Sequence, residues 1–131
     1  MGRGKIVIAS YRDLTVWQRA MDLGALVYKL TADLPREETY GLSSQMQRAA
    51  VSIPSNIAEG HARESTKEYL RYLLISRGSM AELETQLLLC QKLHFLSKEA
   101  VENALIISDE IGRMIRGLQQ SLTKKLAEKS T

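Results

Sequence analysis

The sequence predicts an all-α protein, an up-down-up-down antiparallel four-helix bundle, on three observations. Only 5% of the 131 residues are aromatic and only two are proline, whereas Leu, Ala, Glu and Lys, which favour helices, are abundant. Apolar residues recur at helical spacing in four separate segments. The connectors between these segments are short, so consecutive helices are expected to lie side by side and antiparallel.

The first helix is expected over residues 13–34, with Asp13 as its N-cap and Pro35 as its stop. Its apolar residues follow two heptad registers, although one apolar stripe is enough to dock a surface helix on a core. A second stripe indicates burial on two sides, either inside a wide bundle or against another subunit. We predict that this second stripe forms an oligomer interface, which consists of Leu14, Trp17, Met21 and Tyr28.

The second helix is expected to begin near Leu42 and to end at Gly60, a natural C-terminal stop. Pro54 lies inside this helix and cannot donate the backbone hydrogen bond of its turn, so a kink that costs roughly 3 kcal/mol is predicted. The hydroxyls of Ser52 and Ser55 are candidates to satisfy the freed groups.

Two serines mark the beginnings of the third and fourth helices. Ser65 opens a capping box in which Glu68 is expected to reach back to the N-cap, and the helix that follows should end near Phe95. Ser97 caps the fourth helix, which is expected to fray through a lysine-rich tail.

The charge pattern divides the chain into three parts. Residues 1–12 are expected to be a flexible basic arm, residues 13–123 the four-helix bundle, and residues 124–131 a basic tail. The net charge of +3 divides into +3 for the arm, +2 for the tail and −2 for the bundle. Because basic tails often only keep a protein soluble, this distribution is weak evidence for a nucleic-acid surface.

A polar stripe runs along the second helix, beside its core face. The third helix carries GSMAELETQL, in which Glu82 and Glu84 point to different faces and either one could pair with Arg48. Gly78 in the same stretch costs about 1 kcal/mol against alanine, so close packing is expected there. The alternative interpretation of the polar stripe is a kinked, solvated edge of the second helix. The predicted interaction residues are Gln45, Arg48, Ser52, Asn56, Glu59, Glu82 and Glu84.

No catalytic, cofactor-binding or metal-ligating residue is predicted. Ser52 shares its face with no histidine, and a serine without a base is inert. Cys90 and His94 form an i, i+4 pair, but a zinc site needs three or four ligands, so core packing is the preferred interpretation. The single cysteine excludes an internal disulfide and nothing resembles a secretory leader, so a cytoplasmic protein is expected. No apolar run approaches the ~20 residues of a membrane span, and no membrane partner is expected.

Nucleic-acid binding is the second hypothesis. Basic residues step by four near the start of the third helix, but Glu64 and Glu68 interleave with them, so ion pairs along the helix are the alternative. A ring of subunits would add the fields of several modest patches around one axis. The candidate contacts are Arg63, Lys67, Arg71, Lys124 and Lys125.

Three strings, DLTVWQRA, LPREETYGLSSQMQRAAVSIPSNIAEG and GSMAELETQL, carry a resemblance that spans about residues 11–118. They look like the four-helix bundle protein family that is named after intervening sequences in bacterial 23S rRNA genes. The resemblance implies a left-handed bundle that assembles as a ring-like homopentamer, with a poorly defined biochemical role. A similar bundle, the accessory variability determinant of diversity-generating retroelements, forms a pentamer that binds a reverse transcriptase and nucleic acid, but this role carries over only as an analogy.

We therefore predict a non-enzymatic interaction module whose partner is itself, in a homo-oligomer that the resemblance makes pentameric. The alternative is a nucleic-acid-binding accessory protein that acts with an RNA or a reverse transcriptase. No cofactor and no small-molecule substrate are expected.

Overall fold

The computed structural model describes residues 10–129 of the chain. This part of the chain is all-α, as predicted, and contains no strand. The predicted basic arm lies almost wholly outside the described residues, and so does the very end of the tail. The four helices are α1 (Thr15–Thr31), α2 (Leu42–Ala62), α3 (Thr66–Lys92) and α4 (Lys98–Lys129), with 3₁₀ turns at Tyr11–Asp13 and Arg36–Glu38.

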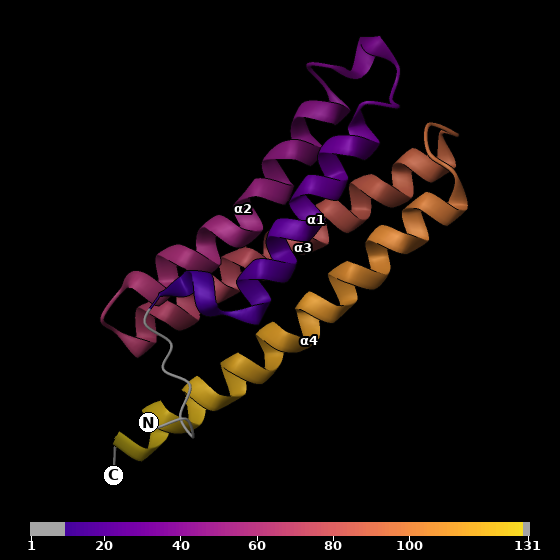
Figure 1. Ribbon diagram of the computed structural model, residues 1–131. Coiled ribbons are helices and arrows are strands. Elements are labelled where there is room, and N and C mark those ends of the chain that lie inside the picture. The colour runs from indigo at the N-terminus through magenta and orange to yellow at the C-terminus, as the bar shows by residue number, and fades with distance from the viewer. Residues whose placement is uncertain (1–9, 130–131) are drawn as a thin grey trace, which may run out of the picture.

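The helices form the predicted bundle, in which each one packs against two neighbours. α1 and α3 both lie beside α2 and α4, whereas within the described residues the Cα atoms of the diagonal pairs stay more than 8 Å apart and only their side chains meet in the core. Successive helices run in opposite directions, so that α1 begins and α4 ends at the same end of the bundle (Figure 1). The left-handed arrangement of the bundle and the kink at Pro54 stay predictions.

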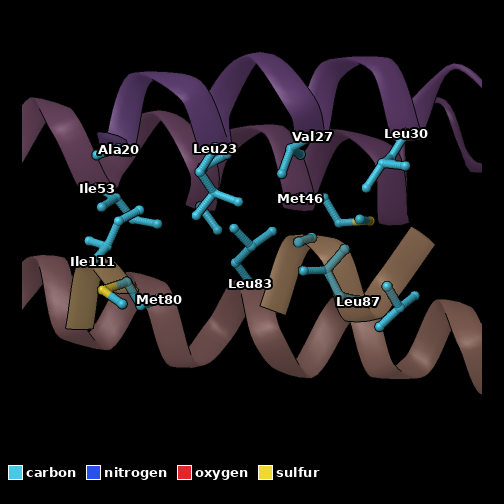
Figure 2. Packing of buried hydrophobic residues seen from close by; sticks show 14 of the residues in the cluster. Ala20, Leu23, Val27, Leu30, Met46, Ile53, Met80, Leu83, Leu87 and Ile111 are labelled. Carbon is cyan, nitrogen blue, oxygen red and sulfur yellow. The ribbon is translucent and has the colours of Figure 1, made fainter. Parts of the chain in front are cut away.

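The core lies along the bundle axis and is lined by one face of every helix. On α1 the core is formed by the first of the two heptad registers, which consists of Val16, Ala20, Leu23, Val27 and Leu30. Leu23 and Val27 are fully buried. Figure 2 shows these two side chains pointing toward Met46 of α2 and Leu83 of α3. Each large apolar side chain that is fully buried contributes about 1.5–3 kcal/mol, so this shared face holds the four helices together.

The first helix begins later and ends earlier than expected. Asp13 does not cap α1, because its carboxylate accepts a hydrogen bond from the backbone N–H of Ser10 at 3.3 Å and closes the preceding 3₁₀ turn. Leu14 takes the N-cap position without a side-chain hydrogen bond. The helix stops at Thr31, and Leu34 is nevertheless buried in the core.

The predicted stop at Gly60 is wrong, because α2 continues to Ala62 and no glycine in the described chain has a positive φ. Gly60 instead allows close approach of two helices: a Cβ atom there would lie 2.8 Å from the Cβ of Tyr72 and 3.0 Å from Cδ1 of Tyr69 in α3. A glycine is therefore needed for packing at this position.

The serine caps are confirmed, with one correction. The Ser65 hydroxyl accepts the backbone N–H of Glu68 at 3.2 Å, and the Ser97 hydroxyl accepts that of Ala100 at 3.1 Å. The Glu68 carboxylate is engaged by Arg71 at 3.3 Å, since an arginine one turn later is a stronger partner than a cap backbone. Each cap satisfies one otherwise unpaired N–H of its helix.

The ends of α3 and α4 also differ from expectation. α3 stops at Lys92, and His94 takes a left-handed conformation with φ 61°, while the backbone N–H of Phe95 bonds to the carbonyl of Cys90 at 2.8 Å. This is how helices often end, although glycine is the usual residue. α4 stays helical through the lysine-rich region to Lys129.

Candidate interaction surfaces

An apolar groove runs along the seam between α1 and α2, and we call it the α1–α2 seam. Because the first heptad register of α1 faces the core, the second register is turned outward, where it meets the face of α2 that carries small residues. The groove measures about 510 Å³. Its lining includes Trp17, Met21, Gly24, Tyr28, Val51 and Ala58.

The structure brings together three of the four residues predicted for the oligomer interface. Met21 and Tyr28 are 47% and 51% exposed, which is high for large side chains with apolar bodies. Trp17 is half-buried and stands edge-on to Tyr11, with ring centroids 5.3 Å apart. Trp17 also packs partly against the core. Leu14 is the exception, because it lies at the N-cap of α1 against the core and is not part of the lining of the groove.

A second exposed apolar face lies on α3 and was missed in the sequence analysis. Leu74 and Leu88 are 59% and 51% exposed. Ile75 and Leu89 belong to the same face and line a groove beside α2. The close packing expected at Gly78 does not occur inside the chain, because nothing lies within 4 Å of the place its Cβ would take. The sequence signal was available, because these residues lie outside the buried stripe of α3, which includes Leu73, Met80, Leu83, Leu87 and Cys90.

The polar stripe of α2 faces α3 across a groove of about 360 Å³. Its floor is closed by hydrogen bonds, because the Ser52 hydroxyl accepts from Ser79 at 2.8 Å and from Asn56 at 2.9 Å. Asn56 also donates to the Ser52 carbonyl at 2.8 Å. The Ser52 hydroxyl thus joins α2 to α3. The groove is lined by Gln45, Arg48, Ala49, Ser52, Ser79, Glu82 and Gln86.

The predicted ion pair of Arg48 is not formed within the described chain. Arg48 is exposed and lines the same groove as Glu82, without an ion pair between them. Glu84 points the other way and accepts a hydrogen bond from the buried Ser108 hydroxyl of α4 at 2.5 Å. Glu59, the last residue of the stripe, pairs with Arg63 at 3.3 Å. The stripe is therefore a set of local contacts with a free arginine at its rim.

Two of the predicted nucleic-acid contacts form ion pairs within the chain. Arg63 pairs with Glu59 and also donates to the Tyr72 hydroxyl at 2.9 Å. Arg71 lies 4.7 Å from the centre of the same ring, and its hydrogen bond to Glu68 raises its pKa. The helical ion pairs that were the alternative interpretation are thus present. Lys67, Lys124 and Lys125 are exposed.

A basic groove between α3 and α4, which we call the α3–α4 seam, was also missed. Arg77 of α3 donates to the side-chain oxygen of Gln119 of α4 at 3.2 Å. Arg116 and Lys124 of α4 line the same groove, which measures about 520 Å³. The sequence signal was available, since the segments that meet here contain arginine and lysine but no acid.

The groups considered for chemistry occupy structural positions. The Cys90 thiol is fully buried, 3.6 Å from the sulfur of Met46, and desolvation raises its pKa to about 11, with a smaller contribution from Glu38. His94 is exposed in the turn after α3. Within residues 10–129, no group of three metal-ligating side chains is found. None of the described helices is long and apolar enough to cross a membrane.

Comparison with known proteins shows the family of this bundle. The family model described as 23S rRNA-intervening sequence protein matches residues 12–117. The chain belongs to this family. The matched region of this 23S rRNA-intervening sequence protein runs from the first 3₁₀ turn into the second half of α4, so it contains the α1–α2 seam and the polar stripe.

A solved structure confirms the fold of the 23S rRNA-intervening sequence protein. The crystal structure of a protein of unknown function from the S23 ribosomal protein family of Bacteroides thetaiotaomicron is similar, with a TM-score of 0.75 and 22% sequence identity. The similarity covers 80% of this chain and 98% of that one. Among curated proteins, none matches the chain significantly.

Proposed function

We propose that this 23S rRNA-intervening sequence protein is a non-enzymatic interaction module that assembles with copies of itself, as a ring of five. The observation that carries the proposal is the exposed apolar lining of the α1–α2 seam. Met21 and Tyr28 are exposed there, beside a half-buried Trp17 that packs partly against the core. Apolar patches that exceed what folding needs are typical of protein–protein contacts.

The partner that fits this seam is the exposed apolar face of α3 on a second copy. Leu74 and Leu88 provide apolar area there, and Gly78 between them leaves room for a close approach. Because the two faces differ, the contact joins one face to another, and repeating it gives a closed ring or an open filament. A ring of five subunits is what the resemblance implies.

The absence of enzymatic activity is part of the proposal. Ser52 is bonded to Asn56 and Ser79 and has no histidine to act as base. Cys90 is supported as a core residue, because a thiol with a pKa of about 11 stays protonated at neutral pH. A cytoplasmic location belongs to the same proposal.

The mass of the full chain in solution tests the assembly. Light scattering on a size-exclusion column should give about five times the 14.7 kDa chain mass. Met21→Glu should reduce the mass to that of one chain without loss of helicity, because a charge in an apolar contact is left without a partner. Ile106→Glu is the matched control: Ile106 is 64% exposed on α4, away from both faces, and the variant should keep the wild-type mass.

A wild-type chain that runs as a monomer at micromolar concentration would contradict the proposal. Equal dissociation of the Met21→Glu and Ile106→Glu variants would assign the effect to charge in general rather than to the α1–α2 seam.

The alternative, an accessory protein acting with an RNA or a reverse transcriptase, finds no support at Arg63 and Arg71, because both are paired with glutamates. A reverse transcriptase as partner stays a prediction.

A further inference from the structure

Two segments of the chain carry basic residues and no acidic ones. Residues 69–81 and 111–127 together contain six arginines and lysines without a single aspartate or glutamate. With 15 acids among 131 residues, two segments of this combined length would contain about three. The basic residues in them are Arg71, Arg77, Arg113, Arg116, Lys124 and Lys125.

The fold places these two segments side by side. Residues 69–81 form the first half of α3 and residues 111–127 the second half of α4, and the two helices are antiparallel neighbours. Figure 1 shows the start of α3 and the end of α4 at the same end of the bundle. The hydrogen bond from Arg77 to Gln119 joins the two segments directly.

Three of these six cations line the α3–α4 seam, and two others form ion pairs outside it. Arg71 and Arg113 are paired with Glu68 and Asp109, which lie just outside the two segments. By contrast, the lining of the seam contains no carboxylate within the described chain; it consists of Arg77, Arg116, Gln119, Gln120, Thr123 and Lys124.

Sequence spacing explains why the two arginines of the seam stay unpaired, whereas Lys124 has Glu128 four residues later. An arginine on a helix surface commonly pairs with an acid three or four residues away. Arg77 has only Leu73, Leu74, Met80 and Ala81 at those positions. Arg116 likewise has no acid there, because its neighbours at this spacing are glycine, arginine and glutamine. Their charge is therefore available to a ligand.

The dimensions of the seam select an extended anion. Arg116 and Lys124 are eight residues apart on one helix, which corresponds to about 12 Å along the axis. A chain of linked phosphates can contact both side chains in their extended form. The neutral residues between them, Gln119, Gln120 and Thr123, are side chains that donate hydrogen bonds to phosphate oxygens.

We propose that the α3–α4 seam is a binding site for the phosphate backbone of a nucleic acid strand, with Arg77, Arg116 and Lys124 as the charged contacts. No aromatic side chain lines the seam, so bases have nothing to stack on and binding is independent of sequence. The site replaces the predicted contacts Arg63 and Arg71, which are engaged within the chain.

The site does not depend on assembly, because a single chain supplies all of its residues. Arg77 lies on the side of α3 that faces α4, whereas Ile75 and Leu89 line the side that faces α2. Arg77 is next to Gly78 and one turn from Leu74 of the exposed α3 face, so the seam lies at the edge of the proposed subunit contact. A ring would repeat it around the axis, which adds to the attraction of a polyanion.

The test measures binding of the full chain to a short fluorescein-labelled single-stranded RNA of mixed sequence by anisotropy, over a range of salt concentrations. The triple variant Arg77→Gln, Arg116→Gln, Lys124→Gln should lose at least about tenfold in affinity at low salt. Its log–log salt slope should become shallower by about 2, since each phosphate contact on a single strand contributes about 0.7.

A control with the same change in charge sits at the opposite end of the bundle. Lys29→Gln, Arg36→Gln, Lys92→Gln removes three exposed cations near the end of α1, in the 3₁₀ turn that follows it and at the end of α3. This variant should bind RNA within about twofold of wild type and keep its salt slope. Arg77→Lys, Arg116→Lys keeps the charge and should also keep binding, because lysine serves phosphate as a point charge.

Three outcomes would overturn the proposal. The first is no RNA binding by the wild-type chain at low salt. The second is equal weakening by the two triple variants, which would show an effect of net charge alone. The third is displacement of RNA by polyglutamate as effectively as by unlabelled RNA of equal charge, which would assign the seam to an acidic protein. Circular dichroism of each variant checks its folding, and the double variant Arg77→Gln, Lys124→Gln, which should still lose affinity and salt slope, carries the test if the triple variant unfolds.

Discussion

The α1–α2 seam and the α3–α4 seam have almost the same size and opposite chemistry. Both are grooves between antiparallel neighbours of one bundle, with volumes of about 510 and 520 Å³. The first is lined by Trp17, Met21 and Tyr28, and the second by Arg77, Arg116 and Lys124. Packing four cylinders creates such seams in any bundle, so the side chains that line them decide what each one binds.

The difference shows that the residues that form the core of this protein and the residues that line its seams have different roles. The first register of α1 is buried and completes the core, while the second register points outward in the same helix. On α3 the apolar residues beyond the inner stripe are likewise exposed. The side chains that stay exposed once the core is complete are the ones available to partners, and we propose an apolar partner for the α1–α2 seam and an anionic one for the α3–α4 seam.

The largest expected effect is a loss of stability when a core residue of α1 is truncated, compared with truncation of a residue in the α1–α2 seam. Leu23→Ala removes a fully buried side chain of α1 and should lower the free energy of unfolding by about 2–5 kcal/mol. Met21→Ala, two residues earlier on the exposed stripe, should change it by about 0.5 kcal/mol or less when the chain is monomeric. Urea unfolding at low protein concentration measures both. Equal losses would mean that Met21 belongs to the core and that the α1–α2 seam is not a free surface.

Gly60 and Gly78 can be compared, because a neighbouring helix packs closely against Gly60 whereas the space around Gly78 is open. Gly60→Ala should destabilise the chain by about 1–3 kcal/mol, because the added Cβ would lie 2.8 Å from the Cβ of Tyr72. Gly78→Ala should stabilise an isolated chain by up to about 1 kcal/mol, because it improves helix propensity and meets nothing within 4 Å. Thermal unfolding of the two variants gives the signs. A destabilising Gly78→Ala in monomeric protein would contradict the open environment of that residue.

Salt should act on the two seams in opposite directions. Contact through the apolar α1–α2 seam should be unchanged or strengthened by sodium sulfate, which favours burial of apolar surface. RNA binding at the α3–α4 seam should weaken more than about tenfold between 50 and 200 mM salt if three phosphates are contacted. Light scattering and anisotropy on one protein sample follow both. An assembly that dissociates as salt rises would show that charges, not Trp17 and Met21, hold it together.

The smallest effect is expected at the turn that joins α3 to α4. His94 has a φ of 61° after the end of α3, a conformation that glycine adopts without strain. His94→Gly should therefore raise the free energy of unfolding by about 0.5–1 kcal/mol. A denaturant midpoint below that of wild type would mean that the histidine side chain has a role in the turn.

Much of the fold could be predicted because it depends on local signals. The heptad pattern of α1 and the serines at 65 and 97 predicted the core face and two helix starts. The end of α2 could not be predicted in this way, since Gly60 can end a helix or admit a neighbour and only the position of Tyr72 decides between them. Asp13 was misjudged for a similar reason, because it caps the turn before α1.

The candidate surfaces were only partly predictable. The second register of α1 predicted the α1–α2 seam, because an excess of apolar residues is visible along one helix. The pairing of Arg48 with a glutamate depended on distances across two helices, and the structure leaves Arg48 without an ion pair. Arg77 and Arg116 belong to different helices 39 residues apart, so their common seam becomes visible only when α3 and α4 are packed together.

The most direct test of the central claim mixes two variants that are each blocked on one face. Met21→Glu blocks the α1–α2 seam and Leu88→Glu blocks the exposed face of α3, so each variant alone should run at 14.7 kDa. In an equal mixture, the intact seam of one chain should bind the intact face of the other, and the light-scattering mass should rise to that of a pair. The pair cannot grow further, because its two outer faces both carry a glutamate. A mixture that stays at 14.7 kDa, or a Leu88→Glu variant that alone keeps the wild-type mass, would contradict the proposal that these two faces join.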